Sequence, residues 1–224
     1  MEESKDSNIV FPIYIICDES QSMEGSKLDA FNKALPEMHK AIASDPFVND
    51  KLRIGIISFS DSAEVLLPLS KMTDIVDTPG LVAKDGTNYG SAFTCLKQTI
   101  QDDISALKMQ SNTFVNRPIV LFISGSAPTD TEWRTAHAAI ADKNWSFSPH
   151  IIAIGIGAIQ AEMIRDIATK VDKSGTYFAY LADENADLVA LFKEIFFSLS
   201  RAIIHNVAGI EFPADGFGFI KLNE

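Results

Sequence analysis

Four nearly continuous apolar runs and a weaker fifth constrain this chain more than any other feature of its sequence. They occupy residues 9–17, 52–59, 118–124, 150–156 and, less clearly, 176–181, and they are rich in β-branched residues. Runs of this kind are typical of strands that are buried on both faces of a parallel sheet. Between them lie amphipathic stretches of helical length, at residues 27–43, 91–107, 131–143, 161–170 and 186–200. The alternation predicts an α/β fold.

One segment interrupts this alternation. Residues 62–69 follow the second apolar run after the short turn Ser60-Asp61, so we expect a hairpin and an antiparallel edge strand. Pro68 agrees, because proline is tolerated at sheet edges. The prediction is a doubly wound, mostly parallel six-strand sheet with one antiparallel edge strand and helices on both faces. We divide the chain into a polar N-terminal segment (1–8), this domain (9–202) and a C-terminal extension (203–224).

The charge of the chain limits its partners. It has 30 acidic and 19 basic residues, a formal net charge of −11, which repels phosphate backbones and anionic lipid headgroups. Nucleic acid and membrane surfaces are therefore not expected partners. The start of the chain lacks the features of a signal peptide, and no run reaches the roughly 18 apolar residues of a membrane span, so we expect a cytoplasmic protein. Cys17 and Cys95 lack the spacing of a zinc or thiol-redox site and are expected to be reduced core residues.

Oxygen-bearing side chains follow the first apolar run, at the strand end where a doubly wound sheet binds its ligands. Asp18, Ser20 and Ser22 alternate in a tight loop before a predicted helix. Hard oxygen ligands of this kind suit Mg²⁺, Mn²⁺ or Ca²⁺, and a site of low formal charge leaves positions for water and for a ligand's carboxylate. The alternative is ordinary loop chemistry, with Ser22 or Ser26 as a helix N-cap and Asp18 as a solvent-facing acid.

Two further loops precede predicted helices. One carries Gly86-Thr87, a flexible backbone beside an exposed hydroxyl, and the other covers residues 124–130 and ends in Thr129-Asp130. We expect Thr129-Asp130 to cap the helix that starts at Thr131. Each loop alone is ordinary turn chemistry, but all three follow one another at strand-to-helix transitions.

In this order the three loops resemble those of the von Willebrand factor A domains, whose metal-ion-dependent adhesion site has the signature D-x-S-x-S, then a Thr, then an Asp. Asp18, Ser20 and Ser22 match the first element and Thr87 the second. The chain is most similar to the TerY-type branch of tellurium-resistance proteins over residues 9–202. The further motifs that carry this resemblance are Phe11-Pro12, Pro68-Leu69, Gly86-Thr87, residues 124–130, residues 153–157 and Leu191-Phe192.

The resemblance implies a site in which Ser20, Ser22 and Thr87 touch a metal ion directly and Asp18 touches it through water. The chain departs from the family at Gly125, which stands where the family has its last Asp. One carboxylate in place of two attracts a dication less strongly, so we expect Mg²⁺, or Mn²⁺ or Ca²⁺, to bind weakly or not at all. Asp85, Asp130 or an acid from a partner are the candidates to compensate.

The expected function is therefore metal-ion-dependent protein binding and not catalysis. The resemblance implies a partner that supplies an acidic side chain, in a bacterial tellurium-resistance or stress-response system with kinase-like or phosphatase-like partners. A metal-free scaffold is one alternative. A metal-dependent hydrolase is a weaker one, because Ser20 stands where phosphatases of the haloacid-dehalogenase type have the second acid of D-x-D.

Other residues suggest less. Gly155-Ile-Gly157 follows a predicted strand but lacks the third glycine of a dinucleotide fingerprint. Trp133 and Trp145 are expected to be packing residues. The histidines show no metal-ligand spacing and are expected to be surface or core residues, at positions His39, His137, His150 and His205.

Overall fold

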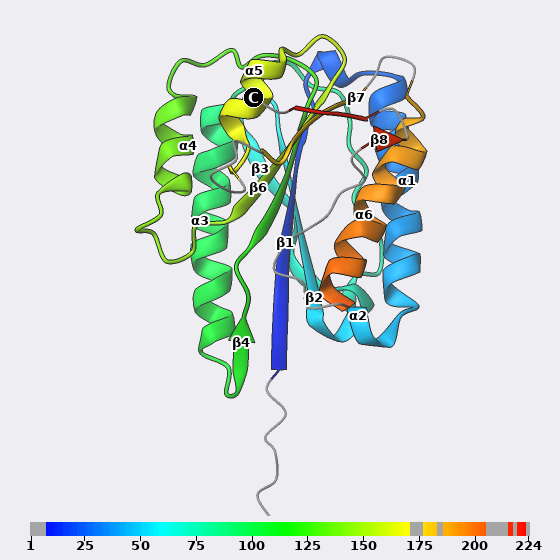
Figure 1. Ribbon diagram of the computed structural model, residues 1–224, viewed down its shortest axis with the longest axis vertical. Coiled ribbons are helices and arrows are strands. Elements are labelled where there is room, and N and C mark those ends of the chain that lie inside the picture. The colour runs from blue at the N-terminus through cyan, green and yellow to red at the C-terminus, as the bar shows by residue number, and fades with distance from the viewer. Residues whose placement is uncertain (1–7, 171–176, 183–185, 205–214, 217–218, 223–224) are drawn as a thin grey trace, which may run out of the picture.

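The computed structural model describes residues 8–170, 177–182, 186–204, 215–216 and 219–222. Strands and helices alternate along most of the chain (Figure 1). The strands are β1 (Asn8–Asp18), β2 (Leu52–Phe59), β3 (Ala63–Lys71), β4 (Thr113–Val115), β5 (Ile119–Ser124), β6 (His150–Ile156), β7 (Ala179–Ala182), β8 (Asp215–Gly216) and β9 (Phe219–Lys221). The α-helices are α1 (Ser26–Ala43), α2 (Pro46–Lys51), α3 (Tyr89–Lys108), α4 (Trp133–Ala141), α5 (Ala161–Ile167) and α6 (Leu188–Ile204).

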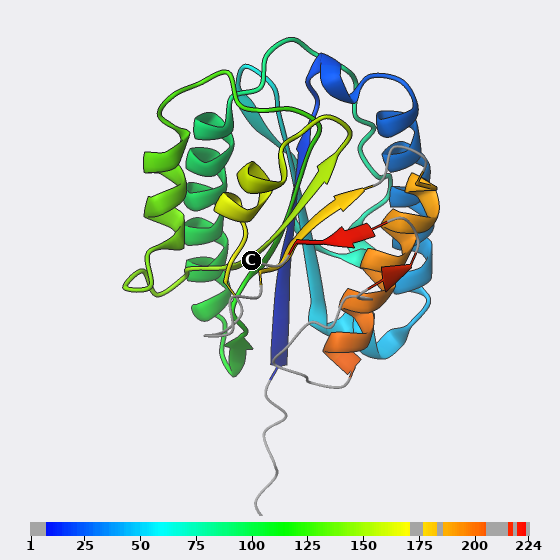
Figure 2. The same cartoon turned by 45° about the horizontal axis from the view of Figure 1, so that its top comes forward.

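The strands form one sheet between two layers of helices. Their order is β3-β2-β1-β5-β6-β7-β9-β8, and the short β4 pairs with the beginning of β1. Pairing is parallel from β2 to β7 and antiparallel at both edges, where β3 lies beside β2 and β9 beside β7. Helices α1, α2 and α6 cover one face, and α3, α4 and α5 cover the other (Figures 1 and 2).

The central strand β1 shows why the apolar runs are continuous. Ile13, Ile15 and Cys17 point to the core beneath α1 and α6, whereas Tyr14 and Ile16 point to the core beneath α3 and α4. Successive side chains of a strand point to opposite faces, so a strand covered on both faces needs apolar residues at every position. All five of these side chains are 0–1% exposed.

The predicted fold class is confirmed. All six predicted strands are present, the segment after Ser60-Asp61 is the antiparallel edge strand β3, and the five predicted helices correspond to α1, α3, α4, α5 and α6. The structure adds the short helix α2 and the strands β4, β8 and β9. Strand β9 lies within the predicted C-terminal extension and pairs with β7, which makes a second antiparallel edge. Cys17 is buried, Cys95 is half-buried, and both are free thiols.

Two connections diverge at the centre of the sheet. β1 leads through α1 to β2 on one side, and β5 leads through α4 to β6 on the other, with the two helices on opposite faces. The carboxyl ends of β1 and β5 therefore lie side by side where the winding of the sheet reverses, which is where open α/β sheets bind their ligands. Asp18 and Ser124 are the last residues of these two strands. No helix in the described ranges is long and apolar enough to cross a bilayer.

Candidate functional site

Asp18 is the buried centre of the site. Its Oδ1 accepts a hydrogen bond from the Ser20 amide at 2.7 Å, and its Oδ2 accepts from the Ser124 hydroxyl at 2.5 Å and from the Gly125 amide at 3.2 Å. The residue is 0% exposed, so the expectation of a solvent-facing acid is wrong. The end of β5 covers it, and the sequence separation of more than 100 residues hides this contact from any local pattern.

Ser20 and Ser22 place two hydroxyl oxygens side by side. Their Oγ atoms are 2.8 Å apart, across the short 3₁₀ turn Gln21–Met23. Neither serine caps a helix, because the N-cap of α1 is Gly25 at φ 79° and the helix begins at Ser26. The helix-cap interpretation of Ser22 and Ser26 is therefore wrong, and the hydroxyl groups of Ser20 and Ser22 do not serve to cap α1.

Thr87 comes to the same edge of the sheet from the loop before α3. It is 4% exposed, and its Oγ1 lies 3.2 Å from the Ser126 Oγ. Its carbonyl accepts from the amide of Thr129 at 2.8 Å. The hydrogen bonds thus bring Asp18, Ser20 and Ser22 together directly and attach Thr87 to the 124–130 loop.

Tyr89 joins these two parts of the site, and the sequence analysis missed it. Its hydroxyl lies 2.8 Å from the Ser124 Oγ and 2.6 Å from the Ser126 carbonyl oxygen. Burial raises the pKa of Tyr89 far above its ordinary value, so the phenol stays protonated and acts as a donor. Ser124 in turn donates to Asp18. No sequence signal distinguishes this tyrosine from a packing residue at the start of a helix.

Asp130 is engaged elsewhere, and no described contact joins the Asp85 carboxylate to Asp18, Ser20, Ser22 or Thr87. The Asp130 carboxylate accepts from the amides of Tyr89 at 2.8 Å and Gly90 at 3.2 Å, so it caps α3. The expectation that Asp130 and Thr129 cap the next helix is wrong, because α4 begins at Trp133 without a side-chain cap. Asp85 is exposed, and its carbonyl, not its carboxylate, accepts from the Asp61 amide.

Buried Glu19 is engaged elsewhere. Its carboxylate pairs with the Lys84 ammonium at 2.8 Å and accepts from the Val82 amide at 3.1 Å, and it is 2% exposed as a residue. Its hydrogen bond to Lys84 is the main cause of a raised Lys84 pKa. In the described part of the chain, no three His, Cys, Asp or Glu side chains gather where they could hold a metal ion.

A lysine partly balances the buried charge of Asp18. The Lys27 ammonium donates to the Ser22 carbonyl at 2.5 Å. Burial lowers the pKa of Lys27, and the nearby charge of Asp18 opposes that shift. Lys27 therefore supplies a positive charge within electrostatic range of the only carboxylate in the D-x-S-x-S loop that faces the site.

Gly125 is closely packed against two neighbouring side chains. A Cβ atom there would lie 2.7 Å from the Met23 Sδ and 3.0 Å from the Ser22 Oγ. Met23 is 0% exposed and fills the place next to this glycine. An aspartate at position 125 requires Met23 to move.

The sequence profile of the von Willebrand factor type A domain matches residues 13–127, which include the Asp18 loop, Thr87 and Gly125. The chain belongs to the von Willebrand factor type A family. No curated protein sequence matches it significantly.

Solved structures show the same fold. Proximal thread matrix protein 1 from the mussel byssus is 17% identical at a TM-score of 0.61, over 87% of this chain and 49% of that one. A von Willebrand factor type A protein from Catenulispora acidiphila is 19% identical at a TM-score of 0.58, over 85% and 42%. The pilus adhesin SpaC from Lactobacillus rhamnosus GG, in its open conformation, is 12% identical at a TM-score of 0.64, over 88% and 30%. This von Willebrand factor A chain spans half or less of their lengths.

The residues behind the competing interpretations lie elsewhere. A Cβ atom at Gly155 would lie 2.6 Å from Leu181, so this glycine allows close packing around β6. His39 and His137 contact the carbonyls of Met72 and Ile167, and His205 lies outside the described residues. Trp133 is buried against Tyr89.

Proposed function

We propose that this von Willebrand factor A domain binds a protein partner through a divalent cation held by Ser20, Ser22 and Thr87, with Asp18 orienting the loop. The observation that carries the proposal is the 2.8 Å separation of the Ser20 and Ser22 hydroxyl oxygens. Ligands at right angles around Mg²⁺, at bond lengths of about 2.0–2.1 Å, are about 2.9 Å apart. The hydroxyl oxygens and their separation fit Mg²⁺ or the similar ion Mn²⁺. They fit Ca²⁺ less closely, because its bonds to oxygen are longer.

The charge of the site argues for weak binding. Asp18 is its only carboxylate, and three hydrogen bonds already occupy its oxygens. Ligand charge count tunes the affinity of such oxygen sites, so we expect a dissociation constant on the order of 1 mM. A carboxylate from the partner would supply the missing negative charge, which makes cation binding and partner binding cooperative.

The surroundings suit a protein partner. Val82, whose amide donates to the carboxylate of Glu19 next to Asp18, is 68% exposed. Exposed apolar side chains next to a polar centre are typical of interaction sites. The similar fold of a pilus adhesin agrees with a binding role. The proposed setting, a bacterial tellurium-resistance or stress-response system with kinase-like or phosphatase-like partners, depends on the sequence motifs alone.

Thermal melting in the presence of Mg²⁺ or Mn²⁺ tests the cation. With about 10 mM metal and the affinity above, mass action stabilises the native state by about 1.4 kcal/mol, a rise in Tm of about 4 °C. Ser22→Ala removes one proposed ligand and should abolish this rise. Ser26→Ala, an exposed serine on the first turn of α1, is the matched control and should keep it. A wild-type Tm that does not respond to either metal contradicts the proposal.

A metal-free binding scaffold is the second candidate, and two observations favour it. Met23 occupies the space next to Gly125, and the Lys27 ammonium supplies a positive charge without any ion. Capture of partners from a lysate with and without chelator separates the two candidates. Capture that Ser22→Ala and chelator both abolish supports the metal bridge, whereas capture that neither affects supports the scaffold.

We also expect no catalysis at this site. The Ser20 and Ser22 hydroxyls contact each other, and within the described structure no histidine contacts them to serve as a base. Phosphate and ester substrates should therefore not be turned over with or without metal. Turnover that disappears in Ser22→Ala but not in Ser26→Ala would identify a hydrolase instead.

A further inference from the structure

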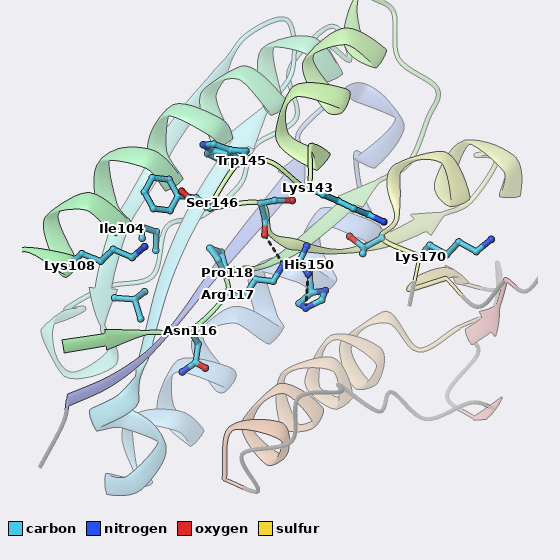
Figure 3. Close-up of a pocket in the computed structure, with 14 residues that line it drawn as sticks. Ile104, Lys108, Asn116, Arg117, Pro118, Lys143, Trp145, Ser146, His150 and Lys170 are labelled. Atoms are coloured by element: carbon cyan, nitrogen blue, oxygen red, sulfur yellow. Dashed lines mark hydrogen bonds between the residues drawn. The ribbon is translucent and has the colours of Figure 1, made fainter. Parts of the chain in front are cut away.

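A second candidate site lies at the opposite end of the strands. A pocket of about 620 Å³ opens where β5 and β6 begin, between the end of α3, the α4–β6 connection and the residues after α5 (Figure 3). Asp18 and Ser124 are the last residues of β1 and β5. The Asp18 loop therefore lies at the carboxyl ends of the parallel strands, and this pocket lies at their amino ends. Its volume is within the roughly 300–1,000 Å³ of small-molecule sites.

The lining of the pocket is basic in an acidic protein. Lys108, Arg117, Lys143 and Lys170 line it, and no aspartate or glutamate is among its described lining residues. In Figure 3, Lys108 lies on one side, Lys143 and Lys170 on the other, and Arg117 between them. Such a cluster raises the local concentration of anions.

Arg117 is held in place without a described carboxylate partner. Its Nε donates to the Ser148 carbonyl at 2.7 Å and its Nη2 to the Pro149 carbonyl at 3.2 Å. Partial burial lowers the pKa of Arg117, yet a guanidinium remains charged at neutral pH. The positive charge is therefore fixed at the pocket by backbone acceptors, with donor capacity left over.

His150 adds a neutral donor beside Arg117. Its Nε2 lies 3.3 Å from the Arg117 Nη1, and because a guanidinium can only donate, Nε2 accepts and the ring proton resides on Nδ1. Burial lowers the pKa of His150 to about 4, so the ring is neutral at pH 7. Nδ1 is buried and has no hydrogen-bond partner among the described residues.

Two aromatic rings also line the pocket. Trp145 and Phe147 line the pocket edge to face, with ring centroids 5.9 Å apart. The Lys108 ammonium lies 4.6 Å from the centre of the Phe147 ring, which keeps its charge close to the pocket. The pocket thus offers separate positive charges beside two aromatic rings.

We propose that this pocket binds a small compound that carries two or more phosphate groups. Lysines act as point charges for phosphate, and Lys108 lies across the pocket from Lys143 and Lys170, so a ligand with several charges can contact more than one of them. A long polyanion would meet the whole charge of −11, whereas a small anion interacts only with charges within a Debye length, about 8 Å at physiological salt. The shared chemistry is the polyphosphate group, which either a nucleotide or free polyphosphate supplies.

Titration of the full chain with tripolyphosphate and with ATP tests this proposal, with sulfate at matched ionic strength as the control anion. Metal is removed from the buffers on a resin, because soluble chelators are polyanions themselves. Trp145 fluorescence and calorimetry report binding. Lys108→Gln/Lys143→Gln removes two exposed cations, and Lys33→Gln, an exposed lysine of α1 on the other face of the sheet, is the matched control.

The expected result is saturable binding with a dissociation constant below about 1 mM, weakened at least tenfold in the double variant and unchanged in Lys33→Gln and Ser22→Ala. Tighter binding of ATP than of tripolyphosphate supports a nucleotide ligand, and equal binding supports free polyphosphate. Three results would overturn the proposal: no saturable binding up to about 10 mM of either probe, equal binding by the double variant, or equal weakening by Lys33→Gln. Because the pocket is remote from Ser22, a negative result for polyphosphate binding does not affect the proposal that Ser20, Ser22 and Thr87 hold a cation.

Discussion

At the scale of single residues, a glycine decides how the site differs from its family. Gly125 donates its amide to Asp18 and lies against Met23, so this position serves as a backbone donor and not as a metal ligand. The glycine that replaces the family aspartate is therefore matched to its surroundings, because an acidic side chain at position 125 requires Met23 to change or move. If the proposed cation binds, its affinity and the packing of this loop both depend on the contact between position 125 and Met23.

We predict that Gly125→Ala destabilises the protein by about 1–3 kcal/mol, since the new methyl group would overlap Met23 and Ser22. Chemical denaturation measures this change. Gly80→Ala is the matched control, because no atom lies within 4 Å of a Cβ at Gly80, and its effect should stay within about 0.5 kcal/mol. Equal effects of the two variants would contradict the close packing.

Restoring the family acid should then depend on Met23. Gly125→Asp alone should lower the Tm, whereas Gly125→Asp with Met23→Ala should bind Mg²⁺ more tightly than wild type, because a second carboxylate adds attraction and has room. Calorimetric titration measures the affinity. Unchanged affinity in the double variant would show that position 125 does not face the cation.

At the scale of elements, helix α3 is joined to a distant loop by a cap that the local sequence does not reveal. The N-terminus of α3 is capped by Asn88 from its own loop and by Asp130 from the loop after β5. Asp130 thereby holds the 124–130 loop against Thr87 and Tyr89. Asp130 precedes α4 in the sequence, but the fold of the loop brings its carboxylate to the first amides of α3, so the predicted cap of the following helix is wrong.

We predict that Asp130→Ala costs about 0.5–2 kcal/mol of stability, because two amides at the positive end of α3 lose their acceptor. Asp85→Ala removes an exposed acid from the neighbouring loop and should change stability by less than about 0.5 kcal/mol. Urea denaturation of both variants measures the difference. A loss of the same size in Asp85→Ala would indicate a general charge effect and not a cap.

At the scale of the whole molecule, the two ends of the parallel strands, called here the carboxyl edge and the amino edge of the sheet, carry different chemistry. The carboxyl edge gathers hydroxyls around one buried acid, and the amino edge gathers cations around a neutral histidine. The second edge links stability to pH, because burial and Arg117 lower the pKa of His150 to about 4. Burial also lowers the pKa of His137.

We predict that stability falls as the pH drops from about 6.5 to about 4. In this window the unfolded state binds a proton at His150 that the folded state does not, so the free energy of unfolding decreases on acidification. The contribution of His150 is roughly 1–3 kcal/mol. His150→Gln keeps an acceptor for Arg117 and should reduce the pH slope, with His39→Gln, on the other face of the sheet, as the control. An unchanged slope in His150→Gln would contradict this assignment.

The sequence by itself determined the fold class, the alternation of strands and helices along the chain, and the position of the D-x-S-x-S loop after the first strand. These follow from local patterns, because a strand covered on both faces must be apolar at every position and a half-covered helix must alternate every three or four residues. The tertiary structure decided what the site residues do. Ser124, Tyr89 and Met23 reach Asp18, Ser126 and Gly125 through contacts between segments far apart in the chain, and the cationic pocket assembles from four such segments. Contacts of that kind depend on how strands and loops meet in space, which no periodicity along the chain records.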